Sequence, residues 1–307
     1  MEDRLLQTND AALKKLNEAW SAGKLTVVVG AGVSVGSRLP LWDELLTEML
    51  GGYVDSEYSE EPYSFFRREI IQRLRDEFAA QSPLTFAQHL QSQMSHDAFV
   101  DLLHSALYKS FKSAPEPSEL AHEIAALGPR LHSVLSFNFD GLIEAALARV
   151  PVEHTTVWKP SQLSEIRGLP VYHPHGFLPF QRESDQQYEI VFAEADYHTQ
   201  YSSQLSWNNV VILRALLETT CLFVGTSLTD PNQRRLLDYA CRQNSTPRHY
   251  FLWRIPDVHH ASGSDKLLQS VHQKIFQGAY SRLGLNPVYT YEWADAPRIV
   301  QRIRRSE

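Results

Sequence analysis

Four short groups of residues combine glycine with side chains that can hold a phosphate or move a proton. Along the chain they are Gly30-Ala31-Gly32 with Ser34, Asn138-Phe139-Asp140, His175-Gly176 and Gly225-Thr226-Ser227. Each group follows an apolar run of the kind that forms a buried parallel strand. Because ligands of open α/β sheets bind at the carboxyl ends of strands, we expect these groups to line one crevice.

The first group invites comparison with a dinucleotide-binding loop. Glycines at Gly30 and Gly32 would let backbone N–H groups approach a pyrophosphate. The usual fingerprint needs a third glycine at a spacing that Gly36 misses by one residue, and an acid after a second strand, which this sequence lacks. The alternative interpretation is a tight strand–helix turn.

The other groups carry polar side chains with two interpretations each. Asn138 and Asp140 either point into the crevice or simply cap the helix that follows them. Imidazole suits proton transfer near neutral pH, so His175 is a candidate base, with His173 two residues before it. Thr226 and Ser227 could meet a ribose, or serve only as turn and cap residues.

The elements that must position these groups can be read from periodicity. Buried or alternating runs predict strands at 25–30, 132–138, 170–175, 188–193, 220–225 and 249–255, with a late one at 286–293. Between about 41 and 128 the pattern is amphipathic and helical, with breaks expected at Gly51-Gly52, Pro83, Pro115 and Pro117. We therefore expect one α/β domain over 1–307, a Rossmann-like doubly wound parallel sheet with a large helical insertion at 41–128.

Composition narrows the class of protein. The 307 residues carry a net charge of −7 with a pI of about 6.0, which argues against a broad or sequence-specific nucleic-acid surface. The last helix has an arginine cluster, interpreted as a solvated face or a partner contact: Arg298, Arg302, Arg304 and Arg305. Two cysteines, Cys221 and Cys241, build neither a disulfide framework nor a four-cysteine zinc site.

The sequence also indicates where in the cell the protein is expected. The N-terminus is polar, without the apolar core of a signal peptide, and no apolar run reaches the ~18 residues of a membrane span. We expect a cytoplasmic protein without a membrane segment.

Taken in order, the four groups resemble the sirtuin superfamily. Its Gly-Ala-Gly-x-Ser signature matches Gly30, Ala31, Gly32 and Ser34, with Pro40 at the family's proline and Trp42 in place of its phenylalanine. Its Asn-x-Asp, His-Gly and Gly-x-Ser motifs match the remaining three groups. The resemblance covers about residues 20–255.

Several positions depart from the deacylases of that family. No cysteine lies between His175 and Cys221, where deacylases carry a four-cysteine zinc module. Phe137, Arg38 and Asp43 replace a glutamine, a glycine and an arginine. These departures disfavour protein deacylation and leave the chemistry at the nicotinamide ribose in place.

The pattern is closer to the bacterial sirtuin-like proteins of antiphage defence, on the large helical insertion and on the segments "EADYHTQYS" and "GTSLTDPNQRRLL". This resemblance implies an NAD⁺ hydrolase that forms nicotinamide and ADP-ribose and depletes cellular NAD. It implies NAD⁺ as substrate, no metal, a homo-oligomer, and a partner such as a helicase-type ATPase or a short Argonaute.

Within that resemblance each residue has an expected role. Asn138 would orient the attacking water, His175 would act as general base and Asp140 would hold the nicotinamide carboxamide. The substrate's remaining contacts would be Gly30, Ala31, Gly32, Ser34, Pro40, Trp42, Gly225, Thr226 and Ser227. ADP-ribosyl transfer to a protein, and a catalytically silent nucleotide-binding scaffold, remain the alternatives.

Overall fold

The computed structural model describes residues 2–58, 63–78, 81–183, 186–203, 205–243, 248–255 and 263–305. Its centre is a seven-stranded sheet in the order β3-β4-β2-β1-β5-β6-β7, in which every paired strand is parallel. The strands are β1 (Leu25–Val29), β2 (Leu131–Ser136), β3 (His154–Val157), β4 (Leu169–Tyr172), β5 (Thr220–Val224), β6 (His249–Arg254) and β7 (Leu285–Thr290). The expected doubly wound parallel sheet is confirmed.

The order of the strands determines where a ligand crevice can form. From β1 the chain builds β2, β4 and β3 outward on one side, and then returns to place β5 on the other side of β1. The winding therefore reverses between β1 and β5. In open α/β sheets the crevice lies outside the carboxyl ends of the strands at that reversal.

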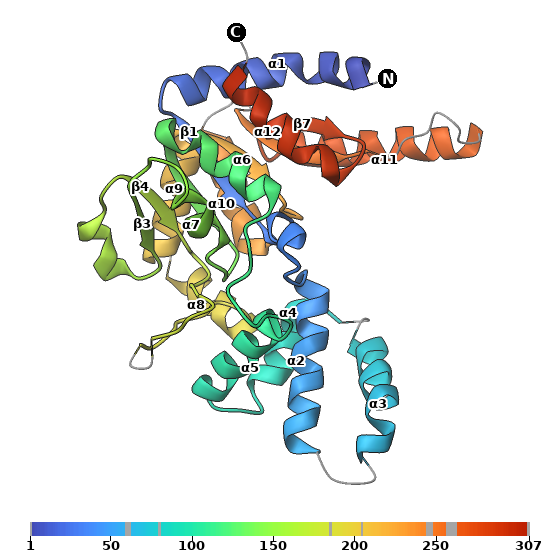
Figure 1. Cartoon of the computed structure of the whole chain (residues 1–307). Helices are drawn as coiled ribbons and strands as arrows, with labels where there is room; N and C mark the ends of the chain where they lie inside the picture. Colours follow the sequence, from blue (N-terminus) through green and yellow to red (C-terminus); the bar gives the residue numbers. More distant parts are fainter. Residues whose placement is uncertain are drawn as a thin grey trace.

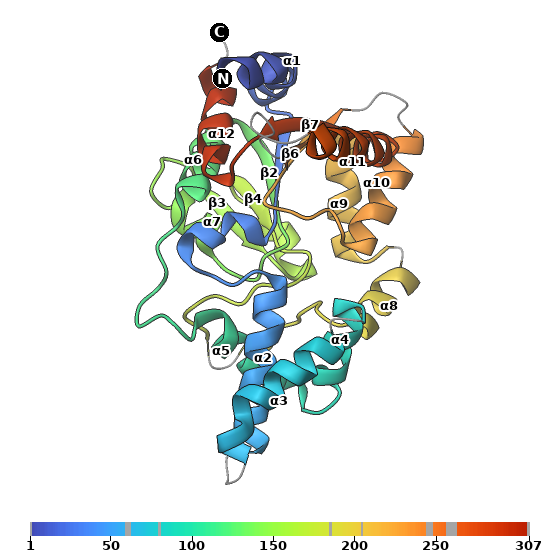
Figure 2. The same ribbon diagram turned by 90° about the vertical axis from the view of Figure 1, so that its right-hand side faces the viewer.

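Helices cover both faces of the sheet (Figures 1 and 2). On one face, four helices pack against the strands in a single apolar cluster: α1 (Glu2–Ser21), α6 (Glu119–Leu127), α7 (Leu142–Leu147) and α12 (Ala296–Arg305). On the other face lie α9 (Trp207–Glu218), α10 (Pro231–Gln243) and the C-terminal end of α11 (Gly263–Ser281). Two faces covered by helices explain why β1 and β5 are almost wholly apolar.

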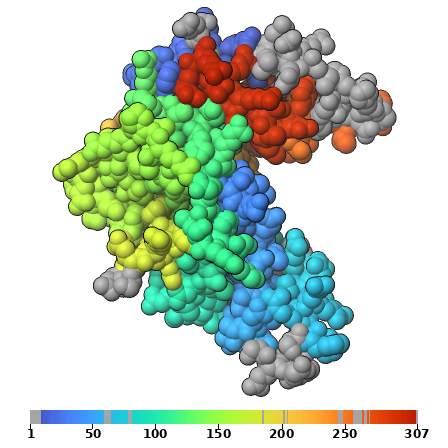
Figure 3. Space-filling view, in the orientation of Figure 1, coloured from blue at the N-terminus to red at the C-terminus, as the bar shows by residue number. Residues whose placement is uncertain are grey.

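Four of the helices between β1 and β2 pack in a second apolar cluster below the sheet in Figure 1. They are α2 (Trp42–Glu57), α3 (Tyr63–Phe78), α4 (Pro83–Gln91) and α5 (His96–Tyr108). Residues after β4 join the same cluster through Leu178, Ile190 and Phe192, and α8 (Glu194–Ser202) lies between these helices and the sheet (Figure 1). The space-filling view in Figure 3 shows the molecule narrowing between the two parts.

Short 3₁₀ segments complete the chain. They are η1 (Ala31–Val33), η2 (Val35–Ser37), η3 (Gly128–Arg130), η4 (Pro160–Glu165) and η5 (Trp293–Asp295). The first two form the connection from β1 to α2, so the loop predicted to bind phosphate is not followed directly by a long helix.

Two expectations about the elements were wrong, and one strand was not predicted. The segment 188–193 is no strand: Tyr188, Ile190 and Phe192 alternate into the second apolar cluster, which gives the period of two without a ladder partner. Strand β3, at the sheet edge, was not anticipated. The expected break at Gly51-Gly52 is absent, because α2 runs through it.

The glycine pair in α2 serves packing instead. A Cβ on Gly52 would lie 2.6 Å from Leu102 Cδ1 of α5, and one on Gly51 would lie 3.4 Å from Arg67 of α3. The missing side chains let two helices approach α2 closely, which offsets the intrinsic cost of glycine inside a helix.

The arginine cluster of α12 is also used within the chain. Arg302 forms an ion pair with Asp10 of α1, and Arg304 pairs with Glu123 of α6. At these two positions the expected solvated face or partner contact is therefore wrong. The two arginines instead pair with helices that pack on the sheet.

Candidate functional site

The loops after β1 and β5 are packed backbone against backbone. The Gly30 N–H donates to Val224 O at 3.0 Å, and the Gly32 N–H donates to Gly225 O at 2.8 Å. A Cβ on Gly30 would lie 2.7 Å from Gly225 O, and one on Gly225 would lie 2.5 Å from Val33 N. Close packing of the two loops therefore explains all three glycines, and in this conformation two of the amides expected at a pyrophosphate already have acceptors.

Asn138 connects the loop after β1 to the turn after β2. Its Nδ2 donates to Gly30 O at 3.1 Å and to Ser34 Oγ at 3.0 Å, and the residue is only 8% exposed. The Ser34 hydroxyl in turn donates to Asp140 Oδ2 at 2.8 Å. Both of these side-chain hydrogen bonds of Asn138 use Nδ2, so Oδ1 is the atom that can act on a water or a ligand.

Asp140 combines the two roles considered from sequence. Its Oδ1 accepts the Leu142 N–H at 3.1 Å at the start of α7, while Oδ2 accepts Ser34. Burial raises the pKa of Asp140, and the bonds from Ser34 and Leu142 oppose that effect. A contact with a carboxamide would have to use the remaining lone pairs of oxygens that already accept bonds.

The two histidines after β4 differ in the hydrogen-bond partners of their ring nitrogens. His173 is fully buried, with Nδ1 at 2.9 Å from Asn138 O and Nε2 at 2.7 Å from Glu144 Oε1. Burial lowers the pKa of His173, but the charge and hydrogen bond of Glu144 outweigh it, so the pKa is raised. Both ring nitrogens are thus occupied, which assigns His173 to bracing the Asn138 turn.

His175 is in a different environment. Its ring packs edge-on against Phe137 and Tyr197, with centroid distances of 4.8 and 5.6 Å. Its buried Nε2 has no hydrogen-bond partner among the described residues and lies 3.5 Å from Asp230 Oδ2. Burial lowers the pKa of His175, partly offset by the charges of Asp230 and Asp196, so the neutral ring is favoured.

The structure adds two side chains that sequence reasoning did not place in the site. Asp230 begins α10, where its Oδ1 accepts the Gln233 N–H at 2.6 Å, and Tyr197 of α8 donates its hydroxyl to Asp230 Oδ2 at 2.5 Å. The Asp-Pro pair at 230–231 signals a helix start. Only the fold shows that this carboxylate faces His175.

A cluster of buried amides supports the same region. Asn208 donates to Pro174 O at 3.2 Å, and Asn232 donates to Gln200 Oε1 at 2.9 Å and to Asn209 Oδ1 at 2.8 Å. The cluster joins α8, α9 and α10 beside the loop that carries His175. No sequence motif identified it, because its members are spread over more than thirty positions in three helices.

The other predicted substrate contacts have local partners of their own. Thr226 Oγ1 accepts the Leu228 N–H at 3.2 Å, and Ser227 pairs with Thr229, both at the rim of the β5 loop. Ala31 is half-buried in η1, and Pro40 is half-buried before α2. Trp42 packs on Phe192 at 4.4 Å between centroids, so in this conformation it packs against the second apolar cluster.

The position two residues before Pro40 is one of those that depart from the deacylases. Arg38 has φ of 65°, the left-handed region, at the place where the resemblance has glycine. The left-handed turn is therefore retained here by a residue that tolerates it less well.

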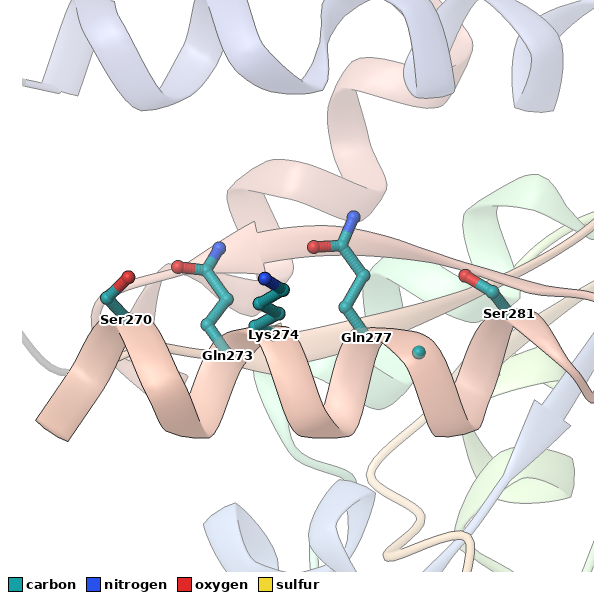
Figure 4. A pocket seen from close by; sticks show the side chains of 6 residues that line it. Ser270, Gln273, Lys274, Gln277 and Ser281 are labelled. Carbon is teal, nitrogen blue, oxygen red and sulfur yellow. The ribbon is translucent and has the colours of Figure 1, made fainter.

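Two hollows lie away from the strand ends. One, of about 560 Å³, runs along an exposed polar face of α11, where Gln273, Lys274 and Gln277 project from the same side of the helix (Figure 4). The other, of about 510 Å³, is apolar and lies between α2, α3 and α4. The candidate site itself is closed, with His175 only 7% exposed.

Two absences concern only the residues that the structure describes. There, three or more His, Cys, Asp or Glu side chains nowhere gather as a metal site would require. Within the same ranges, no helix has the length and apolar character needed to cross a membrane.

Comparison with known proteins agrees with the order of the motifs. Residues 132–275 match the model of the SIR2-like domain, which includes the Asn138, His175 and Gly225 groups and begins after the first glycine loop. Over these residues the chain is similar to the SIR2-like domain.

Two curated relatives that this chain matches carry the name NAD(+) hydrolase ThsA. The protein from Enterococcus faecium is 22% identical over 306 residues, covering 95% of this chain and 58% of the relative. The protein from Bacillus cereus (strain MSX-D12) is 27% identical over 194 residues, covering 60% of this chain and 38% of the relative. The chain thus spans about half the length of these relatives.

Among solved structures, one from work on the structural basis for the mechanism and regulation of Sir2 enzymes covers 99% of this chain and 98% of its own. Its TM-score is 0.42 at 14% sequence identity.

Proposed function

We propose that this chain is an NAD⁺ glycohydrolase that cleaves NAD⁺ to nicotinamide and ADP-ribose. The observation that carries the proposal is the bond of Asn138 Nδ2 to Ser34 Oγ and Gly30 O, which joins the loops after β1 and β2 while leaving Oδ1 for a water. The name of the two curated relatives, NAD(+) hydrolase, supports it.

The reaction breaks the bond between C1′ of the ribose and the nicotinamide nitrogen, and the bonding electron pair leaves with nicotinamide. An oxocarbenium-like centre then forms at C1′, as in glycoside hydrolysis. Water attacks C1′ and loses a proton. Asn138 Oδ1 would hold that water, and the neutral His175 would take the proton.

The remaining residues would bind the substrate. We assign the diphosphate and ribose contacts to the rims of the β1 and β5 loops, at Ala31, Thr226 and Ser227. Asp140, held by Ser34, would supply a fixed carboxylate beside the nicotinamide end, where a preorganised group lowers the barrier. Because His175 and Asn138 are buried, substrate entry requires the site to open.

The cellular role follows from the resemblance stated for the motifs. We propose depletion of NAD⁺ in antiphage defence, by a cytoplasmic homo-oligomer that works with a partner protein and needs no metal. Residues 1–307 would act as one sirtuin-like unit with 41–128 as its insertion, and helices α2 to α5 of that insertion pack in the second apolar cluster together with residues that follow β2 and β4.

The test is to incubate the protein with NAD⁺ and to follow nicotinamide and ADP-ribose by chromatography. Asn138→Ala and His175→Ala are run in parallel, and NAD⁺ binding is measured separately. We expect the wild type to form free ADP-ribose and both variants to lose that activity. Label on protein instead of free ADP-ribose would indicate transfer, and binding without turnover in every condition would indicate a silent scaffold.

A further inference from the structure

The second nitrogen of His175 faces a carboxylate that no motif assigns to the site. Nε2 is buried without a hydrogen-bond partner among the described residues, and Asp230 Oδ2 lies 3.5 Å away. A hydrogen bond normally needs about 2.7–3.2 Å, so a closing of roughly 0.5 Å would form it. Catalytic hydrogen bonds are often long in the absence of substrate and shorten in the complex.

The carboxylate itself is held in place. Its Oδ1 accepts the Gln233 N–H at the start of α10, and its Oδ2 accepts the Tyr197 hydroxyl from α8. Two helices therefore fix the orientation of Asp230. Since Tyr197 donates to Asp230, the tyrosine hydroxyl proton is not directed at His175.

A neutral imidazole has one N–H and one lone pair, and its surroundings select which nitrogen carries the hydrogen. A lone pair on Nε2 would point at the anionic Oδ2 and be repelled, whereas a hydrogen there would be attracted. The other described groups facing the ring do not change this choice, because Phe137 is apolar and Asp196 adds only a second negative charge.

We propose that Asp230, steadied by Tyr197, is the positioning residue that holds His175 in its Nε2–H tautomer, so that Nδ1 is the base. The role of Nδ1 as the base rests on the proposed function. The assignment of the tautomer rests on the geometry alone. The arrangement follows the logic of an acid–histidine pair in which the acid orients the ring and stabilises its cation.

Two readouts separate this inference from the proposed function. The first is histidine ¹⁵N NMR, which reports the tautomer and pKa of His175 without any turnover, with His175→Gln identifying its signals. We expect the Nε2–H form in the wild type. In Asp230→Asn, we expect a mixture of tautomers and a lower pKa, since a carboxylate that favours the cation is gone.

The second readout is the pH profile of kcat/KM for NAD⁺ cleavage. Asp230→Asn should lower kcat by about 10- to 100-fold, and should move the acidic limb to lower pH. Asparagine still caps α10, so folding is preserved. Tyr197→Phe should give a smaller change in the same direction.

Asp196→Asn is the matched control. Asp196 is also an acid at a helix start, where its Oδ2 accepts the Phe192 and Ala193 N–H groups, and its charge reaches His175 without contact. The Asp196→Asn variant should leave the tautomer of His175 unchanged. It should move the acidic limb of the kcat/KM profile less than Asp230→Asn does.

The outcomes are distinct. An unchanged tautomer and pKa of His175 in Asp230→Asn overturns the inference, whatever the activity. Absence of NAD⁺ cleavage by the wild type, together with the expected NMR change, overturns the proposed function and leaves the tautomer assignment standing.

Discussion

The amide of Asn138 donates to Gly30 O and to Ser34 Oγ, and so joins the first two loops at the carboxyl edge of the sheet. The same side chain is the one proposed to hold the attacking water. The stability of the two loops and the proposed chemistry thus depend on a single residue. Its contribution to stability and its contribution to catalysis can be measured separately.

Asn138→Ala should lower kcat for NAD⁺ cleavage on the order of 100-fold or more, because the attacking water loses its acceptor. It should also lower the free energy of unfolding by about 1–3 kcal/mol, since Gly30 O and Ser34 Oγ lose a buried donor. Product formation and urea denaturation measure the two effects.

The control is Ser118→Ala. Ser118 donates to Val33 O of the same loop at 2.7 Å and caps α6 by accepting the Ala121 N–H at 3.1 Å. It should cost about 1–2 kcal/mol of stability while kcat is retained. An equal loss of kcat in both variants would indicate that loop rigidity, rather than Asn138 itself, limits turnover.

Gly225→Ala should lower the free energy of unfolding by about 3 kcal/mol or more. Its φ is +66°, and the new Cβ would meet Val33 N at 2.5 Å, where backbone cannot move aside. Gly23 has φ of +65° with nothing within 4 Å of a new Cβ. Gly23→Ala should therefore cost only about 1 kcal/mol, the conformational part alone. Equal losses in chemical denaturation would contradict the close packing of the two loops.

Arg38→Gly should stabilise the protein by about 0.5–1 kcal/mol. Arg38 is exposed and left-handed, so glycine relieves the backbone while little packing is lost. Leu228 is also left-handed, with φ of 56°, but it is only 2% exposed. Leu228→Gly should instead destabilise by about 2 kcal/mol or more, because buried side-chain volume is removed. Thermal melts of both variants check the opposite signs.

His249 predicts a loss of stability in acid. Its Nδ1 accepts the Cys221 N–H at 3.1 Å, and burial, followed by the charge of Arg248, lowers its pKa to about 4. Between that value and the ordinary 6.5 the unfolded chain binds more protons, so stability is present above pH 6.5 and falls as the pH drops towards 4. Between pH 7.5 and 5 this group should cost about 2 kcal/mol.

His249→Asn tests that assignment, because an asparagine oxygen can replace Nδ1 as the acceptor without titrating. Urea denaturation at the two pH values should show a smaller drop in the variant than in the wild type. A drop of the same size in both would mean that another group controls the acid limb.

Local sequence determined much of the fold. Strands β1, β2 and β5 are buried along almost their whole length, and the apolar runs of β1 and β5 are of the kind that forms parallel strands where helices cover both faces. The motif residues after these strands were identified for the same reason, since the end of a buried strand is a local feature of the sequence. The alternation at Tyr188, Ile190 and Phe192 misled because burial on one side gives a period of two with or without a partner strand.

Tertiary structure decided what those residues touch. The sequence predicts that Gly30, Gly32 and Gly225 contact the substrate, and the structure adds that their small size is required by contact between two loops almost two hundred residues apart. Asp230 showed only a helix start in the sequence, and became a partner for His175 because the winding of the sheet reverses beside β1. Residue types and spacing follow from the chain, whereas the pairing of side chains across strand ends depends on the order of strands, which no local pattern encodes.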